Sequence, residues 1–150
     1  MKAITLWQPY ASLMAAGIKR NETRGRLTHY RGDLVICSAK REMNCDEWPQ
    51  ALKNVVYDNA EKLMVQIGQE KTVGYGYALC IVEVCGCITS EEFVGNTLSM
   101  TEFVCGDYSP GRFAWQTRNL RRLKEPVPVK GAQGFFNLPP DVAAKVRSQI

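Results

Sequence analysis

Apolar residues along the chain fall into short runs that predict strands. Residues 34–37 form a continuous apolar run, which is typical of a strand buried on both faces. Residues 77–87 predict a second largely apolar strand, and residues 3–6 predict a short first one. Residues 113–118 alternate apolar and polar side chains, as a half-exposed strand does, and residues 135–138 predict a last strand.

A short helix is predicted over residues 9–16. Pro9 suits its first position, because the fixed φ of proline fits a helix and the missing N–H is not needed there. Tyr10 and Leu13 recur at helical spacing and mark one buried face. Gly17 adopts positive φ without strain, so we expect it to end the helix.

Further helices are expected where apolar positions recur on one face or a capping residue stands first. Residues 46–68 can form an amphipathic helix with charged side chains outside, and residues 141–146 predict a terminal helix. Ser90 can cap a short helical turn, and residues 100–104 predict another. The Gly, Pro and Asp residues within 106–111 predict a loop.

This succession of short strands and short helices does not suit a series of β-α-β units. It predicts an α+β fold: a small, curved, mostly antiparallel barrel with the short helices packed at its mouth. The 150 residues are an ordinary length for one domain. We therefore expect a single domain over residues 1–150, acting as a monomer.

Composition narrows the class of protein without identifying it. Hydrophobic residues make up 45% and charged residues 23% of the chain, the balance of a globular protein. No window approaches the roughly 18 consecutive apolar residues of a membrane span, and the N-terminal stretch lacks a clear cleavage signal. We therefore expect a cytoplasmic protein with no membrane partner.

Cysteine and histidine usage bears on metals. The six cysteines are expected to be free or buried thiols in a reducing compartment. Cys85 and Cys87 form a C-x-C pair that holds zinc only with further ligands, and His29 is the single histidine, so we expect no metal. No Gly-rich phosphate loop is present, and no cofactor is expected. The net charge of +4 permits nucleic-acid binding without requiring it.

The first candidate site surrounds the predicted helix. Gln8 precedes it, and Lys19, Glu22 and Arg24 follow it within one short polar segment. If a tight turn brings these three together, Lys19 supplies a cation or a base. Glu22 then supplies an acceptor or a general acid/base, and Arg24 a phosphate contact or a partner for Glu22. The alternative is an ordinary surface salt bridge.

A second candidate site lies in the loop and strand at residues 106–115. Tyr108 and Arg112 could supply a stacking surface and a planar donor for an exposed base. Loops of this composition also serve only to turn the chain. Trp115 could join the stacking surface or belong to the core.

A third candidate site holds Lys130 and Gln133. The neighbouring glycines allow close backbone approach, so both side chains could reach a ligand; the alternative is a hairpin turn with a solvated lysine. Lys40, which follows the strand at residues 34–37, can face the same mouth of the barrel.

In this order the segments resemble an ASCH domain (activating signal cointegrator homology). The resemblance spans residues 6–138, and its most diagnostic part is the short pattern G-x-K-x-x-E-x-R from Gly17 to Arg24. The matching segments are W-Q-P-Y at 7–10, G-I-K-R-N-E-T-R at 17–24, Y-R-G-D-L-V-I at 30–36, G-R-F-A-W-Q at 111–116 and K-G-A-Q-G-F-F at 130–136.

The resemblance implies a PUA-like β-barrel with a basic cleft beside the first helix, lined by Lys19, Glu22 and Arg24, and a nucleic acid or nucleotide as ligand. Members of the family differ in activity. Some bind RNA or DNA, some bacterial members look like ribonucleases, and a small bacterial branch hydrolyses N4-acetylcytidine with a Lys, a Thr and a later Glu. Here Glu22 stands at the position of that Thr, and Thr23 is one position away.

Two functional hypotheses involve a nucleic acid or nucleotide, and a third class, an interaction module that binds protein, stays open. The later Glu of the hydrolytic branch could correspond to Glu91, Glu92 or Glu102. The leading hypothesis is a binding domain for single-stranded RNA or a modified nucleotide. The alternative is a metal-independent hydrolase, a ribonuclease or an amidohydrolase acting on a modified nucleoside, in which Lys19 and Glu22 are catalytic.

Overall fold

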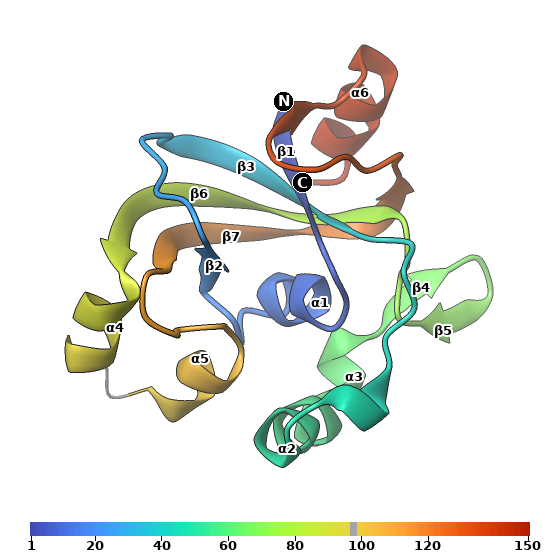
Figure 1. The fold of residues 1–150 in the computed structure, drawn as a ribbon. Coiled ribbons are helices and arrows are strands. Elements are labelled where there is room, and N and C mark those ends of the chain that lie inside the picture. Colours follow the sequence, from blue (N-terminus) through green and yellow to red (C-terminus); the bar gives the residue numbers. More distant parts are fainter. Residues whose placement is uncertain (97–98) are drawn as a thin grey trace.

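The computed structural model describes residues 1–96 and 99–150, and Figure 1 shows its fold. Its strands are β1 (Lys2–Leu6), β2 (Asn21–Arg24), β3 (Gly32–Ser38), β4 (Val65–Ile67), β5 (Glu70–Thr72), β6 (Tyr77–Thr89), β7 (Phe113–Pro128) and β8 (Phe136–Asn137). Its helices are α1 (Tyr10–Ala15), the 3-10 turn η1 (Cys45–Glu47), α2 (Gln50–Asp58), α3 (Ala60–Leu63), α4 (Ser90–Asn96), α5 (Met100–Val104) and α6 (Pro140–Ser148).

The main sheet has six strands in the order β2-β7-β6-β3-β1-β8. β1 and β3 are parallel, and the other neighbours are antiparallel, so the mixed, mostly antiparallel α+β class is confirmed. The expected barrel needs correction, because the sheet is not closed and the PUA-like barrel is not confirmed. The two edge strands, β2 and β8, have only four and two residues. β2 pairs with β7 and β8 pairs with β1, so no strand pairing among the described residues connects the two edges of the sheet.

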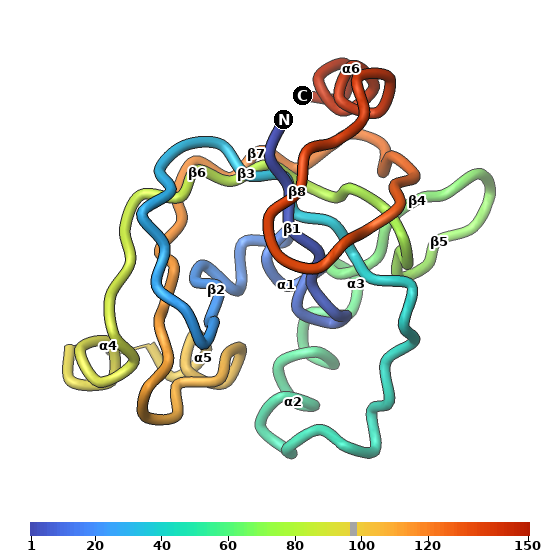
Figure 2. The backbone as a smooth tube through the Cα atoms, turned by 45° about the horizontal axis from the view of Figure 1, so that its top comes forward, coloured from blue at the N-terminus to red at the C-terminus, as the bar shows by residue number. Residues whose placement is uncertain are grey.

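Both faces of the sheet are covered. Side chains alternate along a strand, so Val35 of β3 joins the core cluster under α6, together with Val146 of that helix. Leu34 points the other way and joins the cluster under α1, which supplies Met14. Figure 1 shows the long strands β6 and β7 curving over α1, and in Figures 1 and 2 both chain termini lie beside α6.

The first helix ends as predicted and begins slightly later. Gly17 has a φ of 76° and donates its N–H to the Met14 carbonyl at 3.0 Å. Pro9 stands just before the helix instead of in its first turn, and the Gln8–Pro9 peptide bond is cis. The helix therefore runs over Tyr10–Ala15 and is buried along almost its whole length.

The single helix predicted over residues 46–68 is wrong. Proline has no N–H for a helix interior, and α2 begins only after Pro49. The chain breaks again at Asn59, and residues 65–72 form the β4–β5 hairpin around Gly68, whose φ is 60°. The amphipathic pattern correctly predicted helix at α2 and α3, but it did not distinguish the following hairpin from a helix.

Three further findings concern membranes and metals. The described residues contain no helix long and apolar enough to cross a membrane. All six cysteines are free thiols. The described part of the chain holds no group of three His, Cys, Asp or Glu side chains that could bind a metal ion.

Candidate functional site

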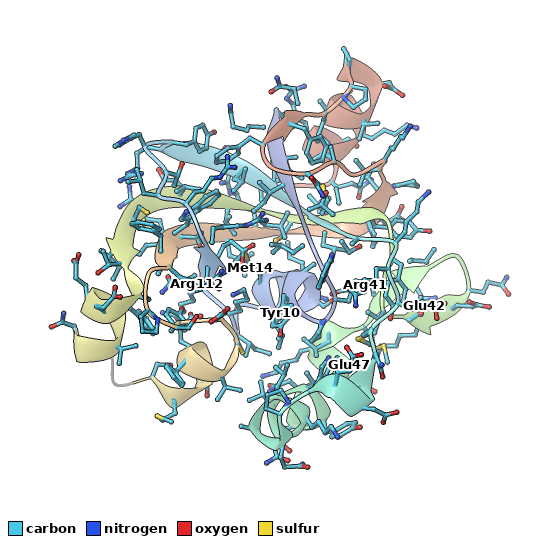
Figure 3. All side chains as sticks on the ribbon, viewed as in Figure 1. Tyr10, Met14, Arg41, Glu42, Glu47 and Arg112 are labelled. Atoms are coloured by element: carbon cyan, nitrogen blue, oxygen red, sulfur yellow. The ribbon has the colours of Figure 1, made fainter. Side chains whose placement is uncertain are left out.

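A pocket of about 500 Å³ opens beside the first turn of α1. Its wall carries three cationic and two acidic side chains next to two aromatic ones, so its charge is mixed. Figure 3 shows two lining residues, Tyr10 and Arg112, on the side of the sheet that α1 covers. The lining residues are Thr5, Leu6, Trp7, Tyr10, Lys19, Glu22, Thr23, Arg24, Gly106, Asp107 and Arg112.

Lys19 is positioned by the turn that ends α1. After Gly17, the main-chain N–H of Lys19 donates to the Leu13 carbonyl at 3.1 Å, so the chain folds back beside the helix. The Lys19 residue is only 2% exposed. Its Nζ donates to the main-chain carbonyl of Cys105 at 2.8 Å and lies 5.8 Å from the centre of the Tyr10 ring. The ammonium group is therefore held in the pocket wall.

Glu22 lies between two cations. Its Oε1 is 3.7 Å from Nζ of Lys19, and its Oε2 accepts a hydrogen bond from Nε of Arg24 at 3.0 Å. The N–H of Thr23 donates to Oε1 at 3.1 Å. Residues two apart in a strand share a face, which places Arg24 beside Glu22, while the turn brings Lys19 to them. The structure thus joins all three predicted residues; their chemical roles stay predictions.

Arg24 connects the pocket to an aromatic stack. Its guanidinium group lies 5.8 Å from the centre of the Trp115 ring and donates to the Thr5 carbonyl at 3.4 Å. Trp115 is buried and stacks on Phe135 at 5.2 Å between ring centroids. Of the two readings of Trp115, the structure therefore favours the core.

The loop at residues 106–112 forms the facing wall. The N–H of Asp107 donates to Oγ1 of Thr23 at 3.0 Å, and Nη2 of Arg112 donates to the Thr23 carbonyl at 3.1 Å. The loop and β2, far apart in sequence, run side by side in Figure 2. Hydrogen bonds from Ser109, helped by the charge of Arg112, hold the pKa of Asp107 below its usual range.

Of the three glutamates considered for the later Glu, Glu102 is the buried one. Its oxygens accept hydrogen bonds from the main-chain N–H groups of Arg20 at 2.6 Å and Asn21 at 3.4 Å. Glu91 and Glu92 are exposed on α4. Burial raises the pKa of Glu102, although those N–H groups and Lys19 act against the rise. The sequence offered only a local signal, the S-x-x-E capping pattern, and Ser99 does accept from the Glu102 N–H at 3.1 Å.

Two predicted ligand contacts have their polar groups occupied inside the protein. Nε2 of Gln8 donates to Oγ of Ser12 and to the Gly74 carbonyl, each at 2.7 Å. The Tyr108 hydroxyl accepts a hydrogen bond from Nδ2 of Asn21 at 3.4 Å, and its buried ring stacks on Phe93 at 4.1 Å between ring centroids. Neither residue lines the pocket beside Lys19.

The remaining three predicted contacts lie outside that pocket as well. Lys40, Lys130 and Gln133 are exposed. The Lys40 stem packs closely against Gly76: a Cβ added to that glycine would lie only 3.1 Å from Cγ of Lys40. Lys130 and Gln133 belong to the loop between β7 and β8. The structure therefore does not gather these residues with Lys19 and Glu22.

Trp7 and Tyr10 are pocket residues that sequence reasoning did not name as ligand contacts. Trp7 is 58% exposed, which is unusual for so large an apolar side chain at the end of a buried strand. Tyr10 begins α1 and turns its ring toward Lys19. Burial, together with nearby Cys105 and Asp107, raises the pKa of Tyr10, so its hydroxyl stays protonated and can donate.

Comparisons with known proteins agree with this architecture. The sequence model of the ASCH domain matches residues 4–126. The chain belongs to the ASCH domain family. No curated protein sequence matches this ASCH domain.

Solved structures of the ASCH protein from Zymomonas mobilis share the fold. A tyrosine-to-phenylalanine mutant has a TM-score of 0.57 at 13% identity, covering 98% of this chain and 96% of that one. A serine-to-alanine mutant has a TM-score of 0.56 at 13% identity, covering 98% and 94%. A third structure of that ASCH protein has a TM-score of 0.53 at 12% identity, covering 98% and 93%. At such low identity the likeness concerns the fold alone.

Proposed function

We propose that this ASCH domain binds single-stranded RNA, or a modified nucleotide, in the pocket beside α1. The observation that supports the proposal is the combination of aromatic and cationic side chains in one pocket, which Trp7 and Tyr10 line together with Arg24 and Arg112. Unpaired bases stack on aromatic rings and on guanidinium planes. The ASCH family is also commonly associated with RNA binding.

The charges of the wall suggest how a nucleotide is oriented. Lys19 is only 2% exposed, so the cations that a phosphate can reach are Arg24 and Arg112. Their side chains are each 30% exposed, although they pair with Glu22 and Asp107. Glu22 is held between Lys19 and Arg24 and repels a phosphate. We therefore place the base against the aromatic residues and the phosphate toward the two arginines.

A salt titration tests this proposal. Single-stranded RNA oligonucleotides are titrated against the protein at several salt concentrations, and log K is expected to fall with log salt by about 0.7 per phosphate contact. Arg24→Gln should reduce that slope by about 0.7 and weaken binding. Arg147→Gln on α6 removes the same charge far from the pocket and should change neither quantity. Absence of binding at low salt would contradict the proposal.

A hydrolase remains the second candidate, because one observation favours it. Nζ of the buried Lys19 and Oε1 of Glu22 lie 3.7 Å apart in the wall of the pocket, close enough for a proton relay through small movements. As a metal-independent ribonuclease or amidohydrolase, the protein would use these two groups as acid and base.

Turnover assays test the second candidate. RNA and acetylated cytidine are incubated with the wild type, Lys19→Ala and Glu22→Gln, and loss of an acid or base should slow turnover by about 100-fold or more. Glu22→Gln keeps the shape of the side chain, so its folding can be checked by circular dichroism. Activity that survives both substitutions excludes this assignment.

A further inference from the structure

A second pocket meets the first at an aromatic wall. It has a volume of about 200 Å³, and Trp7 and Tyr10 line it as well as the first pocket. In Figure 3, Arg112 of the first pocket and Arg41 of the second lie on opposite sides of Tyr10. Single strands are commonly held by stacking successive bases on neighbouring aromatic side chains. Two pockets that share such a wall have the layout for two successive nucleotides.

Arg41 supplies a cation on the far side of that wall. The centre of its guanidinium group lies 4.0 Å from the centre of the Trp7 ring. Arg41 is exposed, and it forms no ion pair with any residue in the described part of the chain. A guanidinium plane stacked on an indole offers a flat surface for a base and free donors for a phosphate.

The acidic residues of the second pocket indicate which part of a nucleotide enters it. Glu42 and Glu47 line the pocket and are exposed. Their charges disfavour a phosphate inside. Carboxylates accept hydrogen bonds from exocyclic amino groups, as in contacts to cytosine, whereas the pairing edge of uracil offers two carbonyl oxygens and a single N–H. Trp48 adds an apolar surface to the same pocket.

We propose that the second pocket is the subsite for the neighbouring nucleotide of a bound single strand. The strand crosses the wall of Trp7 and Tyr10 with one base on each side, the second base lies on Arg41, and the subsite prefers a base with an amino group. This inference rests on the proposed function, because it takes the first pocket as the site of the other nucleotide.

Calorimetric titration with short ribonucleotides tests the subsite. Cytidine monophosphate fills one pocket, and the dinucleotide CpC can reach both. We expect CpC to bind the wild type about five- to a hundredfold more tightly, the range for stacking one further base. Arg41→Ala should abolish this gain and leave the affinity for the monophosphate unchanged. Arg147→Ala is the matched control on α6, and it should retain the gain in full.

The possible failures are distinguishable. If CpC binds no more tightly than the monophosphate, or if Arg41→Ala retains the gain, the subsite is refuted while the first pocket still binds its nucleotide. If Arg41→Ala weakens binding of the monophosphate as much as binding of CpC, Arg41 belongs to the first pocket and the subsite is likewise refuted. If UpU gains as much as CpC relative to its own monophosphate, the preference for an amino-bearing base is wrong. If no ribonucleotide binds, the proposed function itself fails.

Discussion

At the residue scale, the surroundings of two carboxyl groups near the pocket shift their pKa values in opposite directions. Asp107 is exposed and accepts two hydrogen bonds from Ser109, which lower its pKa. Glu102 is buried, and that burial raises its pKa although two main-chain N–H groups point at it. Glu102 holds the segment that carries Lys19, so its ionisation matters to the site.

Replacing Glu102 by Gln should reveal this shift in the dependence of stability on pH. A carboxyl whose pKa is raised by folding contributes stability that is fully present below its unfolded pKa and is lost as the pH rises through its folded pKa. The free energy of unfolding of the wild type, measured against Glu102→Gln, should therefore fall as the pH rises above about 4.3, the ordinary pKa of a glutamate. Urea denaturation at several pH values measures it. A difference that stays constant or rises with pH would contradict the raised pKa.

Residue-scale patterns predicted part of the candidate site. The pattern from Gly17 to Arg24 located Lys19 and Glu22, because a glycine turn followed by a strand is a local feature of the chain. It could not locate Glu102, which reaches Arg20 from 82 positions away in sequence. Contacts of that kind depend on tertiary packing, which no local pattern records.

At the element scale, α1 is attached to the rest of the fold by a polar anchor as well as by apolar contacts. Oε1 of Gln8 accepts the Ser12 N–H at 2.9 Å, and Nε2 donates to the Gly74 carbonyl at 2.7 Å. Gln8 is 4% exposed, so these bonds lie out of water. The anchor holds the start of the helix, where Tyr10 enters the pocket.

Gln8→Ala should destabilise the protein by about 1–3 kcal/mol, because a buried N–H and a buried carbonyl lose their partners. The free energy of unfolding in urea measures the change. Gln133→Ala removes the same amide from an exposed loop position and should stay within about 0.5 kcal/mol of the wild type. Equal stability of the two variants would show that the Gln8 bonds contribute nothing.

Elements were predictable where one period ran without interruption. The buried strand at residues 34–37 and the helix α1 follow from unbroken apolar patterns. The prediction for residues 46–68 failed because apolar positions in α3 and in the β4–β5 hairpin both fit a helical stripe when taken together. The end of β7 was also placed too early: pairing with β6 carries it to Pro128 across irregularities in register.

At the scale of the whole molecule, the class of fold followed from the succession of elements, and the closure of the sheet did not. Closure depends on how the edge strands pair, and the short β2 and β8 have weak patterns of their own. The net charge of +4 likewise does not locate a binding surface. The pocket arises because the sheet brings β2, the end of β1 and the loop at residues 106–112 together.

The position of β2 at the edge of the sheet has a consequence for solubility. An exposed edge strand presents free N–H and C=O groups to which a strand of another molecule can add. Here three main-chain groups of β2 are already bonded to side chains: the Thr23 N–H to Glu22 and the Thr23 carbonyl to Arg112, and the Asn21 N–H to Glu102. Glu22 and Arg112, which line the pocket, therefore also shield the strand from aggregation. A chain that loses them risks self-association as well as loss of its ligand.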